Sequence, residues 1–193
     1  YLARSDSELV DWSAYDKKSY SFAMIAVDRN SDMGILAQNI DAAHAAGIDC
    51  GIMFSVTDGG PLEAAADASA LYEVLRYRQL EYPLYYFFDK TDFSQYSVDS
   101  GQLNQAAEVF CAYFQARKFY IGIAAYDRVL KDNIDPALLK LYDAWLWNEP
   151  LTSYDYTGVY NIVSQYRADL VGYIVSSKRD YPSIMTANHL NGY

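Results

Sequence analysis

Strand-like and helix-like runs alternate along most of the chain. Short runs rich in β-branched and aromatic residues are followed by longer runs whose apolar residues recur with helical spacing. The expected strands are Phe22–Val27, Cys50–Val56, Pro83–Phe88 and Phe119–Ala124, and the expected helices are Ile35–Ala46, Leu62–Leu75 and Leu103–Ala116. This order is typical of βαβ units, so we predict an α/β fold with a mainly parallel sheet.

The helix expected over Leu103–Ala116 shows the amphipathic pattern most clearly. Its apolar residues recur at i, i+3 and i+4 spacing, so one face should pack against the sheet. After Leu146 the pattern changes to shorter strands separated by Gly, Ser and Asn turns. We find no linker, repeat or low-complexity segment, and 193 residues with 52% hydrophobic content suit one domain over residues 1–193.

One aspartate follows each of four strand-like runs, at or just beyond its C-terminal end. These residues are Asp28, Asp58, Asp89 and Asp127. In (β/α) barrels the active site is built at that end of the strands. Aspartate at a βα junction also commonly caps the next helix or shapes a turn, and this second interpretation is favoured for any one of them taken alone.

The run from Tyr82 to Asp89 is apolar and aromatic and ends in a carboxylate, which is typical of a buried strand that carries an acid to a surface. If Asp89 points into a cleft, strand alternation places Tyr85 and Phe87 on its side and the intervening aromatic residues toward the helices. Burial beside an aromatic ring favours the neutral carboxyl, so we expect the pKa of Asp89 to be raised.

Charge and hydropathy exclude two classes of partner. The net charge is −10 and the sequence pI is about 4.5, whereas nucleic-acid binding depends on Lys and Arg contacts to phosphate. No apolar run approaches the roughly 20 residues that cross a bilayer. No N-terminal signal segment is present, and we expect that a leader or a further module precedes Tyr1 in the full protein.

The remaining reactive side chains suggest no cofactor and no metal. Cys50 and Cys111 are expected to be buried free thiols. His44 and His189 are far apart in the sequence and predict neither a metal site nor a catalytic dyad. The serines lack the glycine context of a nucleophile elbow.

Several segments, in order, resemble the family 25 glycoside hydrolases, the bacterial lysozymes (N-acetylmuramidases) that cleave peptidoglycan. The matching segments are Val10-Asp11-Trp12, Phe22 to Ile25, Asn39 to Ile48, Gly51 to Ser55, Ala106 to Cys111, Phe119 to Ile123, Tyr142 to Leu146 and Tyr160 to Tyr166. The resemblance implies a modified, flattened (β/α) barrel with a cleft at the C-terminal ends of the strands. It also implies a secreted or cell-surface protein whose partner is peptidoglycan or a related cell-wall saccharide.

The chain departs from the family where catalysis is expected. The family's first strand carries an aspartate where this sequence offers Leu2 or Ala3. Its Asp-x-Glu triplet is similar in position to Phe87-Phe88-Asp89, so only Asp89, one methylene shorter than the general acid Glu, keeps a carboxylate. Asp180 falls near the place of a late family aspartate, without the rest of that motif.

By this resemblance Asp89 is the remaining general-acid candidate and Asp180 a weaker catalytic one. The candidates for saccharide contact are Tyr85, Phe87, Asp28, Asp58, Asp127, Trp145, Trp147 and Tyr166. Glycoside hydrolysis normally needs two carboxylates unless the substrate's own N-acetyl group attacks. The leading hypothesis is therefore a lysozyme-like domain that binds peptidoglycan with catalysis lost or much reduced. An active divergent muramidase using Asp89 and a non-catalytic protein-interaction domain remain as alternatives.

Overall fold

The computed structural model of the chain describes residues 2–4, 9–14, 22–146, 159–160, 163–167, 172–176 and 187. For residues 2–4, 14, 127, 143, 145, 146 and 159–176 within these ranges it describes the backbone alone.

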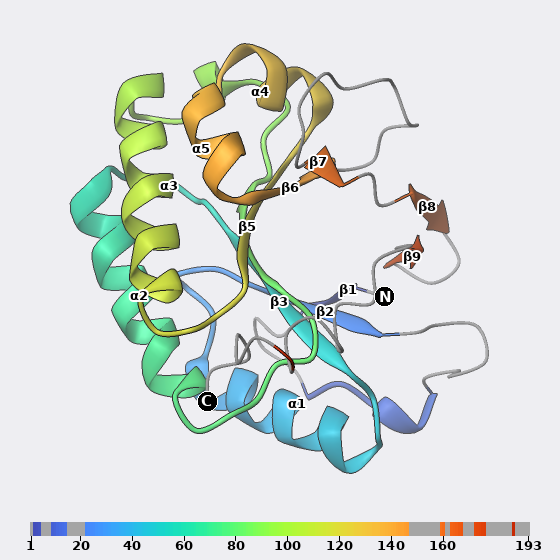
Figure 1. The fold of residues 1–193 in the computed structure, drawn as a ribbon. Helices are drawn as coiled ribbons and strands as arrows, with labels where there is room; N and C mark the ends of the chain where they lie inside the picture. The colour runs from blue at the N-terminus through green and yellow to red at the C-terminus, as the bar shows by residue number, and fades with distance from the viewer. Residues whose placement is uncertain are drawn as a thin grey trace.

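Seven strands form one parallel sheet in the order of the sequence (Figure 1). They are β1 (Leu2–Arg4), β2 (Ala23–Val27), β3 (Cys50–Ser55), β4 (Leu84–Phe88), β5 (Ile121–Ala125), β6 (Asp143–Leu146) and β7 (Val159–Tyr160). A doubly wound sheet would reverse its strand order at a switch point, and this one does not. The predicted α/β class and parallel sheet are confirmed.

A second, antiparallel pair follows, formed by β8 (Val163–Arg167) and β9 (Gly172–Ser176). Strand β9 approaches β1 in space. Among the strands that the structure describes, no ladder joins this pair to the seven-stranded sheet.

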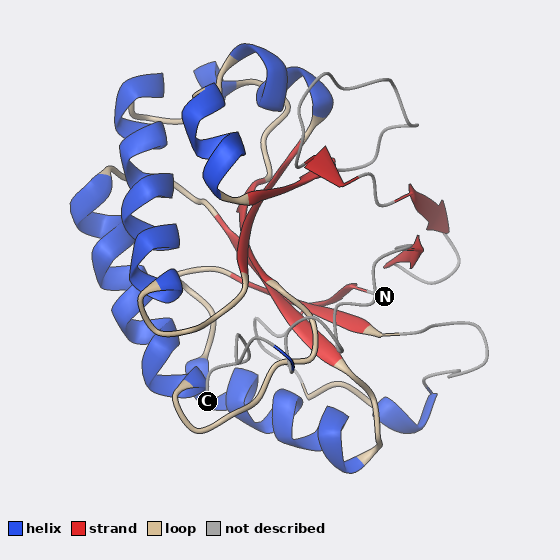
Figure 2. Ribbon diagram, in the orientation of Figure 1, coloured by secondary structure: helices blue, strands red, loops and turns tan. Residues whose placement is uncertain are grey.

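The helices lie on the outer side of the curved sheet (Figure 2). They are α1 (Met33–Ala45), α2 (Pro61–Leu75), α3 (Ser100–Gln115), α4 (Asp127–Asp132) and α5 (Pro136–Leu141), with short 3₁₀ turns η1 (Trp12–Ala14) and η2 (Phe93–Gln95). None of the described helices is both long and apolar enough to span a bilayer.

Capping side chains set where the helices begin. The Asp32 carboxylate accepts from the amide of Gly34 at 2.7 Å, so α1 begins at Met33, two residues before the predicted start. Asp99 caps α3 in the same way through the amide of Gln102 at 2.8 Å, which extends that helix back to Ser100.

The apolar face predicted for α3 is buried against the sheet. Its core residues, which are fully inaccessible to solvent, are Leu103, Ala106, Ala107, Phe110, Cys111 and Phe114. The Tyr86 ring of β4 packs on Phe110 with centroids 4.6 Å apart, so it faces the helices as strand alternation predicts. Cys50 and Cys111 are buried free thiols, as expected.

The expectation that His44 is isolated is wrong. Its Nε2 lies 3.1 Å from Oε2 of Glu81 and 3.6 Å from Sγ of Cys50. The sequence did not predict this contact because Glu81, just before β4, is 37 residues from His44 in the chain.

Candidate active site

Three of the four strand-end aspartates gather at the C-terminal edge of the sheet. Asp28 follows β2 directly, Asp58 lies in the loop after β3 and Asp89 follows β4 directly. Since these strands are parallel and adjacent, their carboxyl ends share one edge. Asp127 is the first residue of α4, after β5.

Asp89 is held by a tyrosine that sequence patterns did not single out. The Tyr96 hydroxyl donates to Oδ1 of Asp89 at 3.3 Å and accepts from the amide of Lys90 at 3.2 Å. Its ring is buried and packs edge-on against Phe88 at 6.1 Å. Burial raises the pKa of Tyr96, so its phenol remains a hydrogen-bond donor.

The pKa of Asp89 is raised, as the sequence predicts, and burial is the main cause. The ammonium of Lys90, 3.8 Å away, and the Tyr96 hydrogen bond oppose the rise, while the charge of Asp28 adds to it. The Asp89 side chain is 33% exposed, so it keeps contact with solvent. The result is a carboxyl group that holds its proton to higher pH than an ordinary aspartate.

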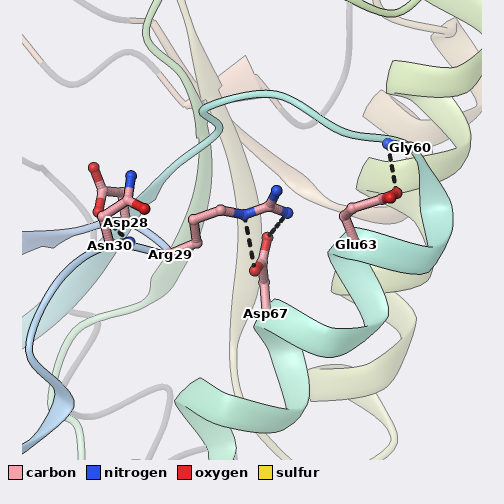
Figure 3. A network of polar contacts seen from close by, with 6 residues as sticks. All are labelled: Asp28, Arg29, Asn30, Gly60, Glu63 and Asp67. Carbon is pink, nitrogen blue, oxygen red and sulfur yellow. Dashed lines mark hydrogen bonds and ion pairs between the residues drawn. The ribbon is translucent and has the colours of Figure 1, made fainter.

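Asp28 shapes the turn between β2 and α1. Its Oδ1 accepts from the Asn30 amide at 2.8 Å and from the Ser31 hydroxyl at 3.2 Å, and its amide donates to that hydroxyl at 2.9 Å (Figure 3 shows Asp28 beside Asn30). The turn interpretation therefore describes its local contacts. Its charge is the smallest of the influences on the pKa of Asp89, which it helps to raise.

Asp58 connects the loop after β3 to the loop after β4. Its Oδ1 accepts from the Ser97 amide at 2.8 Å, next to Tyr96. This backbone hydrogen bond is the main reason that the pKa of Asp58 is lowered. Asp58 is exposed, and its described role is to hold the loop that carries Tyr96.

Arg29 connects this edge to α2. Its guanidinium forms a two-bond contact with Asp67, with Nη2 to Oδ2 at 2.8 Å and Nε to Oδ1 at 3.3 Å (Figure 3). The hydrogen bond that Arg29 donates to Asp67 is the main reason that the pKa of Arg29 is raised. One turn earlier, Glu63 accepts from the Gly60 amide at 3.0 Å and fixes the start of α2. The β2–α1 turn is therefore anchored to a helix.

Tyr85 and Phe87 of β4 are buried, at 1% and 6% exposure. Phe87 pairs in register with Ser55 of β3 and Ala124 of β5, so neither described neighbour supplies a carboxylate. Phe87 offers a small surface to a ligand, whereas Tyr85 offers almost none. Their saccharide contacts remain predictions.

The other predicted site residues are placed only in part. Trp145 of β6 pairs with Ala124, in the same row across the sheet as Phe87, and Tyr166 lies on β8. Trp147 and Asp180 lie outside the described residues. The structure thus brings Asp89 and Tyr96 into contact, and Asp28 and Asp58 follow strands that end at the same edge of the sheet.

Comparison with solved structures identifies the fold. The CTP1L endolysin matches with a TM-score of 0.69 and 12% identity, over 96% of this chain and 69% of that chain. The bacterial lysozyme from Streptomyces coelicolor matches with a TM-score of 0.61 and 15% identity, over 91% and 86%. The chain has the fold of a lysozyme.

The modular autolysin LytC from Streptococcus pneumoniae, solved with a synthetic peptidoglycan ligand, matches with a TM-score of 0.64 and 16% identity. The match covers 90% of this chain, which spans 45% of the length of LytC. No family model matches the sequence, and no curated protein matches it. The resemblance to family 25 lysozymes is confirmed as a likeness of fold.

The lysozyme-like edge can supply one acid held in place. Asp89 is a partly buried carboxyl with a raised pKa, oriented by Tyr96, as a general acid requires. The position two residues before it, which shares its side of the strand, holds a phenyl ring. The described part of this edge thus offers proton donation from Asp89, while the carboxylates of Asp28 and Asp58 accept hydrogen bonds from loop amides.

Proposed function

We propose that the chain is a lysozyme-like domain that binds bacterial peptidoglycan and whose catalysis is lost or much reduced. In this proposal residues 1–193 form one flattened barrel, closed through the antiparallel pair, and the protein acts outside the cell. The fold of the autolysin and endolysin neighbours supports a cell-wall role. The observation that carries the loss of catalysis is Phe87, a buried ring two residues before the one remaining acid.

A single acid supports only half of glycoside hydrolysis. Protonation of the leaving oxygen by Asp89 must be combined with a second carboxylate or with attack by the substrate's N-acetyl group. A buried phenyl ring at position 87 and Leu2 or Ala3 on the first strand cannot orient that group by charge or hydrogen bond. Loss of one transition-state interaction of this kind commonly costs on the order of 100- to 1,000-fold in rate.

Saccharide binding does not need the missing carboxylates. The carboxylates of Asp28 and Asp89 can accept hydrogen bonds from sugar hydroxyls. The predicted aromatic residues Trp145, Trp147 and Tyr166 would supply flat faces on which sugar rings pack. Asp58 and Asp127 complete the predicted contact set, and Asp180 would be the late acid. We assign no cofactor to this role.

An active, divergent muramidase is the second candidate, and a specific observation favours it. The raised pKa of Asp89, its Tyr96 hydrogen bond and the nearby Asp28 charge are features of a functioning acid. Asp28 would then have to stabilise the positive charge of the transition state.

The deciding experiment combines a turbidity assay on purified peptidoglycan with a pull-down on the same material. Binding without clearing supports the proposal. Clearing that Asp89→Asn abolishes, and that the exposed control Asp132→Asn leaves intact, establishes the active enzyme instead. If the chain neither binds peptidoglycan nor clears it, both hypotheses are overturned and a protein-interaction domain remains.

A further inference from the structure

Three side chains of different chemistry converge at the N-terminal edge of the sheet, opposite Asp89. His44 lies in the last turn of α1, Cys50 is the first residue of β3, and Glu81 precedes β4. The His44 Nε2 lies 3.1 Å from the Glu81 Oε2 and 3.6 Å from the Cys50 Sγ. All three potential ligand atoms lie within 4.8 Å of one another.

We propose that His44, Cys50 and Glu81 bind one Zn²⁺ ion. Imidazole nitrogen, thiolate sulfur and carboxylate oxygen are the ligands that zinc takes, at about 2.0–2.3 Å. Tetrahedral geometry at those bond lengths separates neighbouring ligand atoms by about 3.3–3.7 Å. The two separations from His44 Nε2 fall close to this spacing, and Cys50 Sγ lies within 4.8 Å of the Glu81 carboxylate, so small side-chain rotations would admit the ion.

Charge also suits a divalent cation. A Cys50 thiolate and the Glu81 carboxylate would together balance the ion, with neutral His44 as the third ligand. Cys50 is fully buried, so a bound cation would displace the proton of its thiol.

The backbone holds the three ligands in place without a metal. The Cys50 carbonyl accepts from the Glu81 and Tyr82 amides, each at 3.1 Å, and the Cys50 amide donates to Glu81 Oε2 at 3.1 Å. The Gly47 amide closes the end of α1 on the His44 carbonyl at 2.8 Å, with φ of +67° at Gly47. The His44 and Glu81 side chains are 31% and 22% exposed, so an ion can reach them from solvent.

Such an ion would serve structure rather than hydrolysis. Cys50 and Ser55 begin and end β3, so the cluster and the Asp89 edge are separated by about 17 Å of strand. Bound zinc would join the end of α1 to β3 and to the segment before β4. Zinc binding at this cluster is therefore independent of peptidoglycan binding at the Asp89 edge.

Metal titration of the full chain, without a polyhistidine tag, reduced and stripped with chelator, tests the site. Calorimetry with ZnCl₂ should give one equivalent bound. Co²⁺ should produce the near-ultraviolet charge-transfer band of a thiolate–cobalt bond. Mutation of a residue that only hydrogen-bonds a metal ligand typically lowers metal affinity by about 10- to 100-fold. Removal of a ligand itself should cost more, so Cys50→Ala, His44→Gln and Glu81→Gln should each weaken Zn²⁺ binding by more than about 100-fold.

Cys111→Ala is the matched control, because Cys111 is the chain's other buried thiol and lies on α3. It should keep both the affinity and the cobalt band. Glu81→Gln retains an oxygen that can accept from the Cys50 amide, so it tests the ligand even if Cys50→Ala fails to fold. Absence of Zn²⁺ binding, a Co²⁺ spectrum without the charge-transfer band, or full affinity in folded Glu81→Gln would each overturn the proposal.

Discussion

The Tyr96 hydroxyl donates to the Asp89 carboxylate at 3.3 Å while it accepts from the amide of the next residue, Lys90. One phenol thus fixes both the side chain of the acid and the backbone that carries it. The orientation of Asp89 therefore depends on a residue from the loop after β4.

Tyr96→Phe should raise the pKa of Asp89 further, because the hydrogen bond from Tyr96 favours the ionised carboxylate. It should also lower the free energy of unfolding by about 1 kcal/mol, since the Lys90 amide loses its acceptor. Carbon-detected NMR titration of the Asp89 carboxyl measures the first effect and urea unfolding the second. Tyr77→Phe, at a residue that is 70% exposed, is the control. An unchanged Asp89 titration in Tyr96→Phe would show that the hydrogen bond has no influence on the acid.

Asp89→Asn should stabilise the chain near neutral pH. Because the pKa of Asp89 is raised in the folded state above its ordinary value of 3.8, the folded chain binds this proton more tightly than the unfolded chain. The stability that this provides is present below the unfolded pKa and is lost as pH rises through the folded value. Urea unfolding as a function of pH should therefore show the variant's advantage over the unmodified chain growing as pH rises through that window.

Asp58→Asn should show the opposite sign, because the pKa of Asp58 is lowered in the folded state. Its contribution is present above the unfolded pKa and is lost as pH falls through the folded value. Asp58→Asn should thus be the less stable chain near neutral pH and should match the unmodified chain in acid. Parallel pH profiles for Asp58→Asn and Asp89→Asn would contradict at least one of the two pKa directions.

Phe87→Asp combined with Asp89→Glu should restore a pair of carboxylates on one side of β4, about 6.5–7 Å apart along the strand. Placing a charge where Phe87 is 6% exposed can cost several kcal/mol of folding stability unless it finds partners. Peptidoglycan clearing should rise above that of the unmodified chain, and further with Ala3→Asp. Asp89→Glu alone is the control. A folded triple variant that binds peptidoglycan without clearing it would show that the missing acids do not explain the loss of catalysis.

The Arg29–Asp67 contact should stabilise the chain by about 1 kcal/mol in a double-mutant cycle, at the upper end for such pairs. Its side chains are 30% and 15% exposed and meet through two bonds. The Arg128–Asp132 pair, 3.7 Å apart and 72% and 63% exposed, should give about 0.3 kcal/mol. Urea unfolding of both cycles makes the comparison, and equal coupling energies would refute the anchoring role of Arg29.

Much of the fold follows from local pattern. The spacing of apolar residues in α3 predicted its buried face, and the alternation along β4 predicted that Tyr86 faces the helices, because each depends on residues near in sequence. Helices α1 and α3 begin before their predicted first residues because Asp32 and Asp99 act as their N-caps.

The candidate site was predictable only in part. The strand pattern predicted that Asp89 lies at the end of β4, and the aromatic residues around it predicted that its pKa is raised. Tyr96 belongs to a loop without periodicity, and His44 meets Glu81 only after two strands have paired. Such contacts are set by tertiary structure, and no spacing in the sequence records them.

The sequential strand order has a consequence for biogenesis. Each strand from β2 to β6 pairs with the strand synthesised immediately before it. The sheet can therefore grow from its N-terminal side as the chain leaves the ribosome, without waiting for a distant partner. Until the next strand emerges, however, the newest one presents an open hydrogen-bonding edge, and this is where a chaperone or a second nascent chain would act.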